Sequence, residues 1–214
     1  MLNIQKFVCN PIHENCYVVS DNTKECIIID CGAFYEEERA AIVDYIKKNE
    51  LKPMHLLATH GHIDHNVGNN TIYDVFGLKV EIHGKDENLI ENLAKQKEDL
   101  FKEKPDYDFP PVGKYLNEND VIAFGNHEFT ILETPGHTPG GVFYYCKEEN
   151  VAFSGDTLFR GSIGRTDFEN GSMFQIIQSL RMVSQLPDKT VILPGHGEKT
   201  TMGYEETTNP YLDR

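Results

Sequence analysis

The feature that most constrains this chain is the stretch THGHIDHNVG at residues 59–68, which crowds three histidines and one aspartate into six positions. A helix presents only residues three or four apart on one face, and a strand sends neighbours to opposite faces, so neither gathers all four side chains. Because the apolar run MHLLA precedes it, the stretch predicts a loop at a strand end. His60 and His62 would then line one side of a cavity. Asp64 and His65 would project from the first turn of a helix, where a carboxylate is favoured.

Three further potential ligands occupy the same kind of position later in the chain. His137 follows the strand-like run FTILE in the turn ETPGHTPGG, Asp156 follows VAFS, and His196 follows TVIL in VILPGHG. This recurrence predicts that the fold brings several strand ends around one site. Five imidazoles and two carboxylates exceed the four ligands of a tetrahedral zinc and suit two metal ions that share a bridging group.

The rest of the chain alternates β-rich runs with helical patterns. The predicted strands cover residues 2–9, 16–20, 26–31, 54–60, 78–83, 121–124, 128–135, 142–146, 151–156 and 190–196. The predicted helices cover residues 34–50, the segment from the loop to Val75, and residues 85–103 and 172–186. Because some strands follow one another directly and others are separated by helices, we expect an α/β fold of mixed sheets covered by helices. A length of 214 residues fits a single domain, 1–214.

Composition narrows the class of partner. The formal charge of −14 disfavours nucleic acid, since phosphate binding needs a basic surface, and leaves a small-molecule substrate. The first residues do not read as a secretory signal, and no apolar run is long enough to span a membrane. The five cysteines lack the close pairing of a structural zinc site. We therefore expect a reduced, cytoplasmic protein without a membrane partner.

Arg165, in the segment GSIGRTDF, is the candidate for holding a substrate carboxylate, because a guanidinium group can bind two oxygens at once. The alternative is a structural salt bridge with Asp167, two residues later. Histidines outside the ligand set have structural interpretations. His55 and His83 lie in strand patterns and indicate packing, and His127, in the hairpin turn GNHE, is predicted to be exposed.

The motifs HGHIDH, TPGHTPGG, SGDTLF and PGHG, in this order, resemble the metallo-β-lactamase superfamily of metal-dependent hydrolases. The resemblance spans nearly the whole chain, from residues 15–19 to 209–212. It implies a four-layer αββα sandwich with two mixed sheets and the site along one edge. It also implies an assignment of ligands: one metal ion on His60, His62 and His137, the other on Asp64, His65 and His196, with Asp156 bridging both. Zinc is the expected metal, and iron and manganese are the alternatives, since such ligands accept all three.

Within that superfamily, SGDTLFRGSIGRTDF and PGHGEKTT most resemble the short bacterial glyoxalase II-like hydrolases. The resemblance implies that a hydroxide bridging two metal ions cleaves thioesters of the hydroxyacylglutathione type, with Asp64 as a ligand and as the catalytic residue that orients the hydroxide. Asn69 stands where the family commonly has a second glycine, which we expect to affect loop conformation. The chain ends about eighteen residues after His196, so we expect no C-terminal helical domain of the kind that helps full-length glyoxalase II grip glutathione.

Other functions remain as alternatives. A mononuclear iron persulfide dioxygenase resembles this chain through GRTDF and uses only two histidines and one aspartate, but its family looks more like PAHD where this chain has PGHG. A β-lactamase is disfavoured by the missing export signal. A non-catalytic metal-binding domain is the last alternative, and the intact set of seven ligands argues against it.

Overall fold

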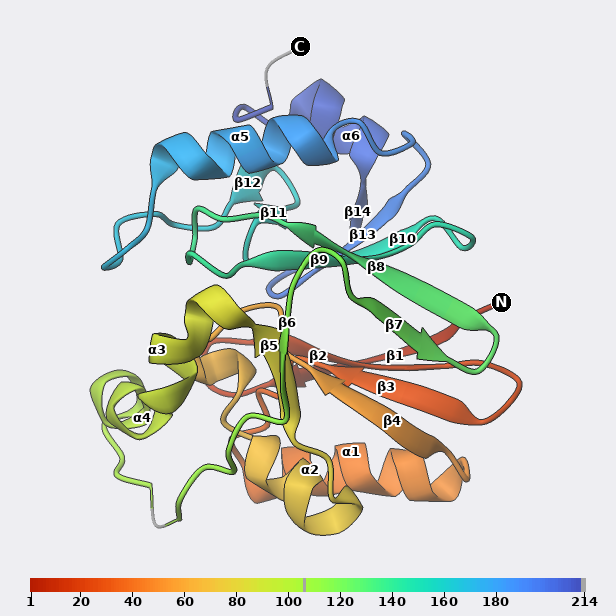
Figure 1. Ribbon diagram of the computed structural model, residues 1–214, viewed down its shortest axis with the longest axis vertical. Helices are drawn as coiled ribbons and strands as arrows, with labels where there is room; N and C mark the ends of the chain where they lie inside the picture. Colours follow the sequence, from red (N-terminus) through yellow and green to blue (C-terminus); the bar gives the residue numbers. More distant parts are fainter. Residues whose placement is uncertain (106, 213–214) are drawn as a thin grey trace.

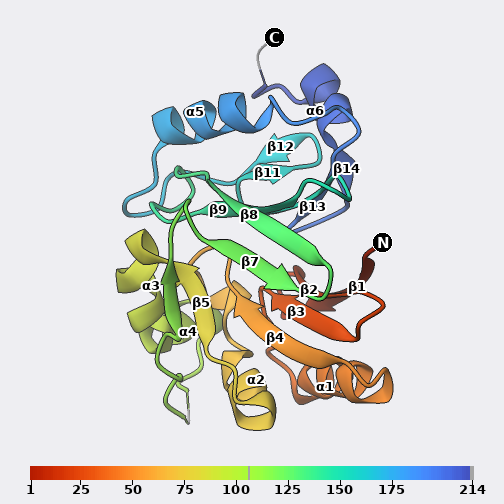
Figure 2. The same cartoon turned by 45° about the vertical axis from the view of Figure 1, so that its right-hand side comes forward.

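Two six-stranded sheets face each other at the centre of the molecule, and helices cover their outer faces (Figure 1, Figure 2). The structure is a computed structural model that describes residues 1–105 and 107–212. Helices α1 (Glu36–Lys48) and α2 (Asn69–Phe76) cover the first sheet, and helices α5 (Met173–Val183) and α6 (Met202–Thr208) cover the second. The predicted four-layer αββα sandwich with two mixed sheets is confirmed.

In the first sheet, the strands lie side by side in their order along the sequence. Their bounds are β1 Asn3–Cys9, β2 Glu14–Ser20, β3 Glu25–Ile29, β4 Lys52–Leu57, β5 Val80–His83 and β6 Lys114–Leu116. The pairs β1–β2 and β2–β3 are antiparallel, while β3–β4, β4–β5 and β5–β6 are parallel. Each parallel pair is joined by a segment that contains a helix, because the chain must cross back to the starting end of the sheet before it can form a parallel strand.

The second sheet has the order β14–β13–β10–β9–β8–β7. Its strands are β7 Val121–Phe124, β8 His127–Glu133, β9 Val142–Cys146, β10 Val151–Gly155, β13 Val191–Pro194 and β14 Thr200–Thr201. Only β10 and β13 pair in parallel, across the connection that contains α5. A short hairpin of β11 (Leu158–Phe159) and β12 (Ser162–Ile163) lies between β10 and α5 in the sequence.

Alternating residues of the strands build three apolar layers. In β2, Val18 packs in the layer under α1 and α2, whereas its neighbour Val19 packs between the two sheets. In β9, Tyr144 faces the space between the sheets, whereas Phe143 packs against Ile176 of α5. Each sheet is therefore apolar on both faces, which explains why several strands read as unbroken hydrophobic runs.

The helix predicted over residues 85–103 is broken in the structure into α3 (Glu87–Glu91) and α4 (Leu93–Phe101). The break lies at Asn92, whose side-chain amide donates to the carbonyl oxygen of Asn88 at 2.6 Å. An asparagine side chain that takes over a backbone acceptor competes with the regular helical bond. The hydrophobic period alone did not reveal this competition. Strands β6, β11, β12 and β14 and helix α6 were also not predicted.

The prediction that His127 is exposed in a turn is wrong. His127 begins β8 and is only 7% exposed, because the turn consists of the two preceding residues. Its Nδ1 lies 3.1 Å from Oδ2 of Asp21, and its Nε2 lies 3.0 Å from Oε1 of Glu149. The two carboxylates come from other hairpins, so the local motif GNHE could not indicate that the ring would be enclosed.

No helix in residues 1–105 and 107–212 is long and apolar enough to cross a membrane. All five cysteines are buried and form no disulfide, and four of them lie in strands, where cysteine packs as a small apolar side chain. His55 and His83 lie in β4 and β5, as predicted.

Candidate metal centre

Side chains around the loop after β4 hold it in shape. The amide of Asn66 donates to the carbonyl oxygens of His60, at 3.0 Å, and His62, at 2.7 Å. The next residues form a single 3₁₀ turn, η1 (Ile63–His65), which carries the other two candidate ligands of the loop. The loop-then-helical-turn arrangement predicted from the sequence is therefore present, with a 3₁₀ turn in place of an α-helical one.

The first group of candidate ligands consists of His60, His62 and His137, whose ligand atoms all lie within 4.8 Å of one another. Nδ1 of His62 and Nε2 of His137 face each other at 3.0 Å. His137 reaches this position from the turn after β8, where Gly136 has φ of 144°. A Cβ atom on Gly136 would lie 2.4 Å from Ile176, so only glycine allows this turn to pass so close to α5.

The second group consists of Asp64, His65 and His196. Oδ2 of Asp64 lies 3.2 Å from Nε2 of His196 and 3.4 Å from Nε2 of His65. His196 belongs to the segment after β13, in the second sheet, whereas the other two belong to η1 beside the first sheet. Both sheets therefore contribute side chains to the second group, as they do to the first.

Asp156, which follows β10, lies between the two groups. One carboxylate oxygen is 3.4 Å from Nε2 of His65, and the other is 3.6 Å from Nε2 of His137 and 3.7 Å from Nε2 of His196. A Cβ atom on Gly195 would lie 2.4 Å from the same carboxylate, which accounts for the glycine in PGHG. All seven side chains singled out in the sequence are therefore brought together.

Asp30, at the end of β3, orients two of the histidines. It accepts hydrogen bonds from the backbone N–H of Thr59 at 2.7 Å and from the hydroxyl of Thr59 at 2.8 Å. The same hydroxyl lies 3.1 Å from Nδ1 of His60, and Nδ1 of His65 lies 3.0 Å from Asp30. With Nδ1 of each ring donating to these oxygens, both Nε2 atoms are left with lone pairs directed at the centre.

The other two rings are fixed by backbone oxygens. Nδ1 of His137 is 2.7 Å from the carbonyl oxygen of Arg165, and Nδ1 of His196 is 3.1 Å from that of Ile12. A carbonyl only accepts, so each Nδ1 carries the proton and each Nε2 is an acceptor. Four rings in the same tautomer are prepared to bind cations.

The charges of the buried groups support this reading. Burial, with the neighbouring His137, lowers the pKa of His62 to about 4, and burial holds the pKa of His60 well below its usual value. Burial would also lower the pKa of His65, but the carboxylates of Asp64 and Asp156 raise it well above the usual range. His60 and His62 are thus neutral imidazoles, whereas the carboxylates of Asp64 and Asp156 favour a positive charge beside them, which a bound cation would supply.

Unpartnered buried atoms test whether this donor set fits metal ions. Nε2 of His60, Nε2 of His65 and Oδ1 of Asp156 are buried and have no hydrogen-bond partner among the described residues. Each such atom costs about 1–3 kcal/mol when it loses water without a replacement. Divalent cations would satisfy all three, and imidazole with carboxylate suits zinc, iron or manganese.

Sequence reasoning missed Asp30, although its signal was present: it directly follows the buried strand run CIII, as the ligands follow their strands. Glu14 was also missed. Both of its oxygens are buried without a hydrogen-bond partner in the described structure, and burial raises its pKa well above the usual value. Glu14 forms a further group with Asp30 and His65, but Nδ1 of His65 already bonds to Asp30, so we assign no metal there.

Arg165 lies next to the centre, since its carbonyl oxygen bonds to His137. Its guanidinium donates to both oxygens of Asp167, at 2.7 and 2.8 Å, and both side chains are more than half exposed. The guanidinium also stacks on Phe168, with 4.2 Å to the ring centroid. The ring of Phe168 contacts His62 and His137, with centroids 4.9 and 5.6 Å apart. The salt bridge between Arg165 and Asp167 is therefore present, but it stabilises the fold only weakly because both side chains are exposed.

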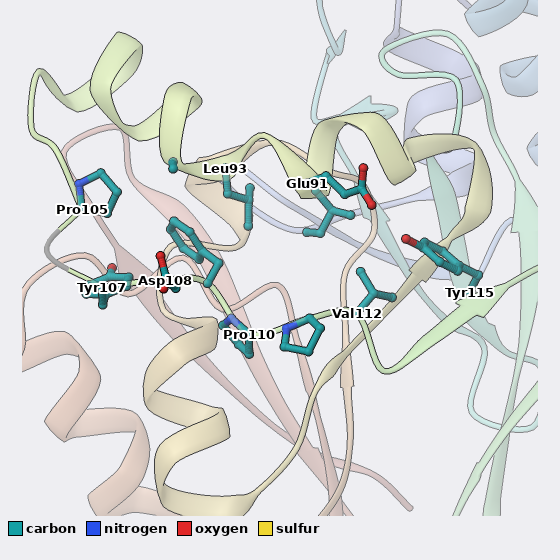
Figure 3. A pocket seen from close by; sticks show the side chains of 12 residues that line it. Glu91, Leu93, Pro105, Tyr107, Asp108, Pro110, Val112 and Tyr115 are labelled. Atoms are coloured by element: carbon teal, nitrogen blue, oxygen red, sulfur yellow. The ribbon is translucent and has the colours of Figure 1, made fainter.

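A cavity of about 800 Å³ lies between α3, α4 and the proline-rich connector that follows them (Figure 3). Apolar side chains such as Leu93, Pro110 and Val112 line it, together with the carboxylates of Glu91 and Asp108. None of the seven candidate ligands lines this cavity, so it is separate from the metal centre.

The fold and this centre define a metal-binding hydrolase of a known class. The sequence profile of the metallo-β-lactamase superfamily matches residues 9–196, and the chain belongs to that superfamily. It is 37% identical over 216 residues to hydroxyacylglutathione hydrolase GloC of Haemophilus influenzae, with 99% of both chains covered. The membership expected from the motifs is confirmed.

Two solved structures are similar over nearly their whole length. The crystal structure of BLEG-1 B3 metallo-β-lactamase superposes with a TM-score of 0.90 at 32% identity, covering 99% of this chain and 100% of the other. The structure of TTHA1623 in a di-iron-bound form gives a TM-score of 0.85 at 34% identity, covering 97% and 100%.

Proposed function

We propose that this protein is a dinuclear metal-dependent hydrolase that cleaves thioesters, with hydroxyacylglutathione-type thioesters as its substrate class. The observation that carries the proposal is the set of buried, unpartnered atoms on His60, His65 and Asp156, which meet at the junction of two complete ligand groups. The similarity to hydroxyacylglutathione hydrolase GloC over the full length of both chains supports the choice of substrate class.

In this proposal, His60, His62 and His137 would hold one ion, Asp64, His65 and His196 would hold the other, and Asp156, which lies between the two groups, would be the shared ligand. When bound, the two ions supply Lewis acidity toward a carbonyl and lower the pKa of a water molecule. Zinc is the proposed metal, and the di-iron form of the similar TTHA1623 keeps iron as the alternative to test.

Asp64 has the proposed catalytic role of orienting the attacking water. Burial alone would raise its pKa, but His65 and His196 lower it, so the carboxylate is ionised at neutral pH and can accept a hydrogen bond. Hydrolysis consumes one water and releases a carboxylic acid and a thiol. Because a thiolate is a good leaving group, the chain needs no dedicated acid beside the sulfur.

Arg165 is the proposed contact for a substrate carboxylate. Its exposed pair with Asp167 can exchange for another carboxylate at little cost, since solvent screens the attraction between exposed charges. The stack on Phe168 would keep the guanidinium next to the centre during that exchange. Arg165→Met should raise KM for a glutathione thioester about tenfold, as expected from the loss of a charged hydrogen bond, and leave kcat and stability nearly unchanged.

The test is steady-state hydrolysis of S-lactoylglutathione and of unrelated thioesters by protein loaded with zinc, iron or manganese. Asp64→Ala should abolish turnover in a folded protein, whereas Asp44→Ala, an exposed aspartate of α1, should not change it. Near-normal activity of the Asp64 variant at stoichiometric metal would contradict the proposed mechanism.

The similarity to BLEG-1 favours β-lactam hydrolysis as the second candidate function. Nitrocefin hydrolysis by the same metal-loaded samples measures it directly. Oxygen uptake with glutathione persulfide tests the dioxygenase alternative in parallel. If either activity exceeds thioester hydrolysis in kcat/KM, the proposed substrate class is wrong.

A further inference from the structure

The first group of ligands depends on two loops from different sheets. His60 and His62 lie on the loop after β4, and His137 lies on the loop after β8. An ion bound by all three requires these loops to keep a fixed separation. The hydrogen bonds that hold the two loops together therefore affect the metal affinity of this site. This inference rests on the proposed metal pair.

One carboxylate joins the two loops. Asp86 ends the 3₁₀ turn η2 (Gly84–Asp86) after β5 and has no exposed surface. Its Oδ2 accepts hydrogen bonds from the backbone N–H of Gly61 at 2.9 Å and from the hydroxyl of Thr138 at 2.7 Å. Its Oδ1 accepts one from the backbone N–H of Gly140 at 2.6 Å. Three donors thus satisfy a buried charge that has no bonded cation among the described residues.

The partners of Asp86 directly adjoin the ligands. Gly61 separates His60 from His62, and Thr138 follows His137. Every ligand of the first group is therefore one residue away from a group that Asp86 holds.

The close approach also requires glycine on both loops. A Cβ atom on Gly140 would lie 2.7 Å from the Asp86 carboxyl group, and one on Gly61 would lie 2.6 Å from Leu89. Each loop therefore brings a glycine backbone N–H to this carboxylate, and the second loop adds the hydroxyl of Thr138.

The second group is held by other residues. The side-chain amide of Asn10 donates to the carbonyl oxygen of Asp64 at 2.9 Å, Asp30 bonds to His65, and the carbonyl oxygen of Ile12 bonds to His196. None of these hydrogen bonds involves Asp86. Asp30 also reaches His60 through Thr59, so the two sites share that support, whereas the hydrogen bonds to the Asp86 carboxylate come from residues next to the first group.

We propose that Asp86 is a positioning residue that sets the affinity of the three-histidine site without contacting the metal. Residues that support metal ligands typically contribute about 10–100-fold to metal affinity. In Asp86→Asn, an amide N–H₂ must face one of three donors, so at least one hydrogen bond is lost. We expect affinity for one zinc ion to fall about 10–100-fold while affinity for the other is retained.

The experiment is a zinc titration of the full chain against a chromophoric chelator, with wild type, Asp86→Asn and Asp21→Asn. Asp21 is a matched control, because its buried carboxylate also accepts several hydrogen bonds but lies in a different cluster. Zinc anomalous scattering from crystals grown with one equivalent of zinc assigns the weakened site. Thr138→Val, which removes one donor and keeps the side-chain shape, is the milder variant and should weaken the same site by a smaller factor.

Equal zinc affinities in wild type and Asp86→Asn would overturn the proposal, as would an equal loss in Asp21→Asn. If Asp86→Asn does not fold, Thr138→Val decides: unchanged affinity at the three-histidine site overturns the proposal. A wild-type chain that takes up no zinc overturns both this proposal and the proposed function. Selective weakening in a protein that hydrolyses no thioester supports the role of Asp86 and contradicts only the proposed function.

Discussion

Two clusters of histidine and carboxylate in the described structure, the candidate metal centre and the group around His127, differ in one respect. At the candidate metal centre, Nε2 of His60, Nε2 of His65 and Oδ1 of Asp156 have no hydrogen-bond partner in the described structure. In the other cluster, His127 bonds to Asp21 through Nδ1 and to Glu149 through Nε2, so both ring nitrogens are satisfied.

The two clusters lie at opposite ends of the same strand. β2 begins at Glu14, whose backbone pairs with His196, and ends at Ser20, next to Asp21. Seven residues of strand separate the ends by roughly 20 Å. The same residue types therefore serve two purposes. Around His127, both ring nitrogens have carboxylate partners, and the result is a structural network. At the candidate metal centre, ring nitrogens and carboxylate oxygens are left without hydrogen bonds, and the result is a candidate ligand set.

The largest effect should come from the residue that both metal groups share. Asp156→Ala removes a ligand close to each group, so we expect the thioesterase rate to fall about 1,000-fold, corresponding to several kcal/mol of lost transition-state stabilisation. Metal content and kcat/KM measured on the same sample check this. Full activity at reduced metal content would show that Asp156 does not bridge a catalytic pair.

His127→Ala should lower the stability of the fold and leave metal binding and activity unchanged. It removes two hydrogen bonds to carboxylates and leaves a small cavity, so we expect the free energy of unfolding to fall by about 3 kcal/mol. Urea denaturation measures this loss. Zinc content and activity at a temperature where the variant is folded should match wild type, and a loss of metal would contradict the separation of the two clusters.

The paired cluster should also respond to acid in a defined direction. Burial alone would raise the pKa of Asp21, but hydrogen bonds from Thr23, Asn126 and His127 lower it well below its usual range. A carboxylate with a lowered folded-state pKa stabilises the fold above its unfolded pKa, about 4, and this contribution is lost as pH falls through the folded value. The stability difference between wild type and Asp21→Asn should therefore be constant from neutral pH to about 5 and shrink below about 4. A constant difference down to pH 2 would be inconsistent with that shift.

The smallest effect concerns a half-buried pair that belongs to neither cluster. His55 and Glu81 are 2.6 Å apart, and this hydrogen bond raises the pKa of His55 although burial opposes it. A raised histidine pKa stabilises the fold below the unfolded value of about 6.5, and the contribution is lost as pH rises through the folded value. Compared with His55→Gln, wild type should gain about 0.5 kcal/mol at pH 5.5 that is absent at pH 9. Thermal unfolding at the two pH values measures it, and a gain at high pH would refute the assignment.

The sequence identified the candidate ligands because they lie in the segments that follow apolar strands, so a local pattern marks positions on a shared edge. For His127, the local pattern misled, because it indicated only a hairpin turn. The residue that encloses its ring, Asp21, lies 106 positions away in the sequence. Asp86 is similar, since its role depends on Gly61 and Gly140, which only the packed sheets bring near it. Candidate ligands at strand ends can be recognised in a single sequence, whereas the pairing of polar groups that are distant in the sequence is seen only in the folded structure.

Metal analysis of the purified chain decides whether the seven side chains hold a pair of metal ions. After loading with zinc and removal of free metal, we expect about two ions per chain in wild type and in His127→Ala, and fewer in Asp156→Ala. Wild-type protein that retains no metal, or a His127 variant that loses metal as Asp156→Ala does, would show that these side chains do not form a separate metal centre.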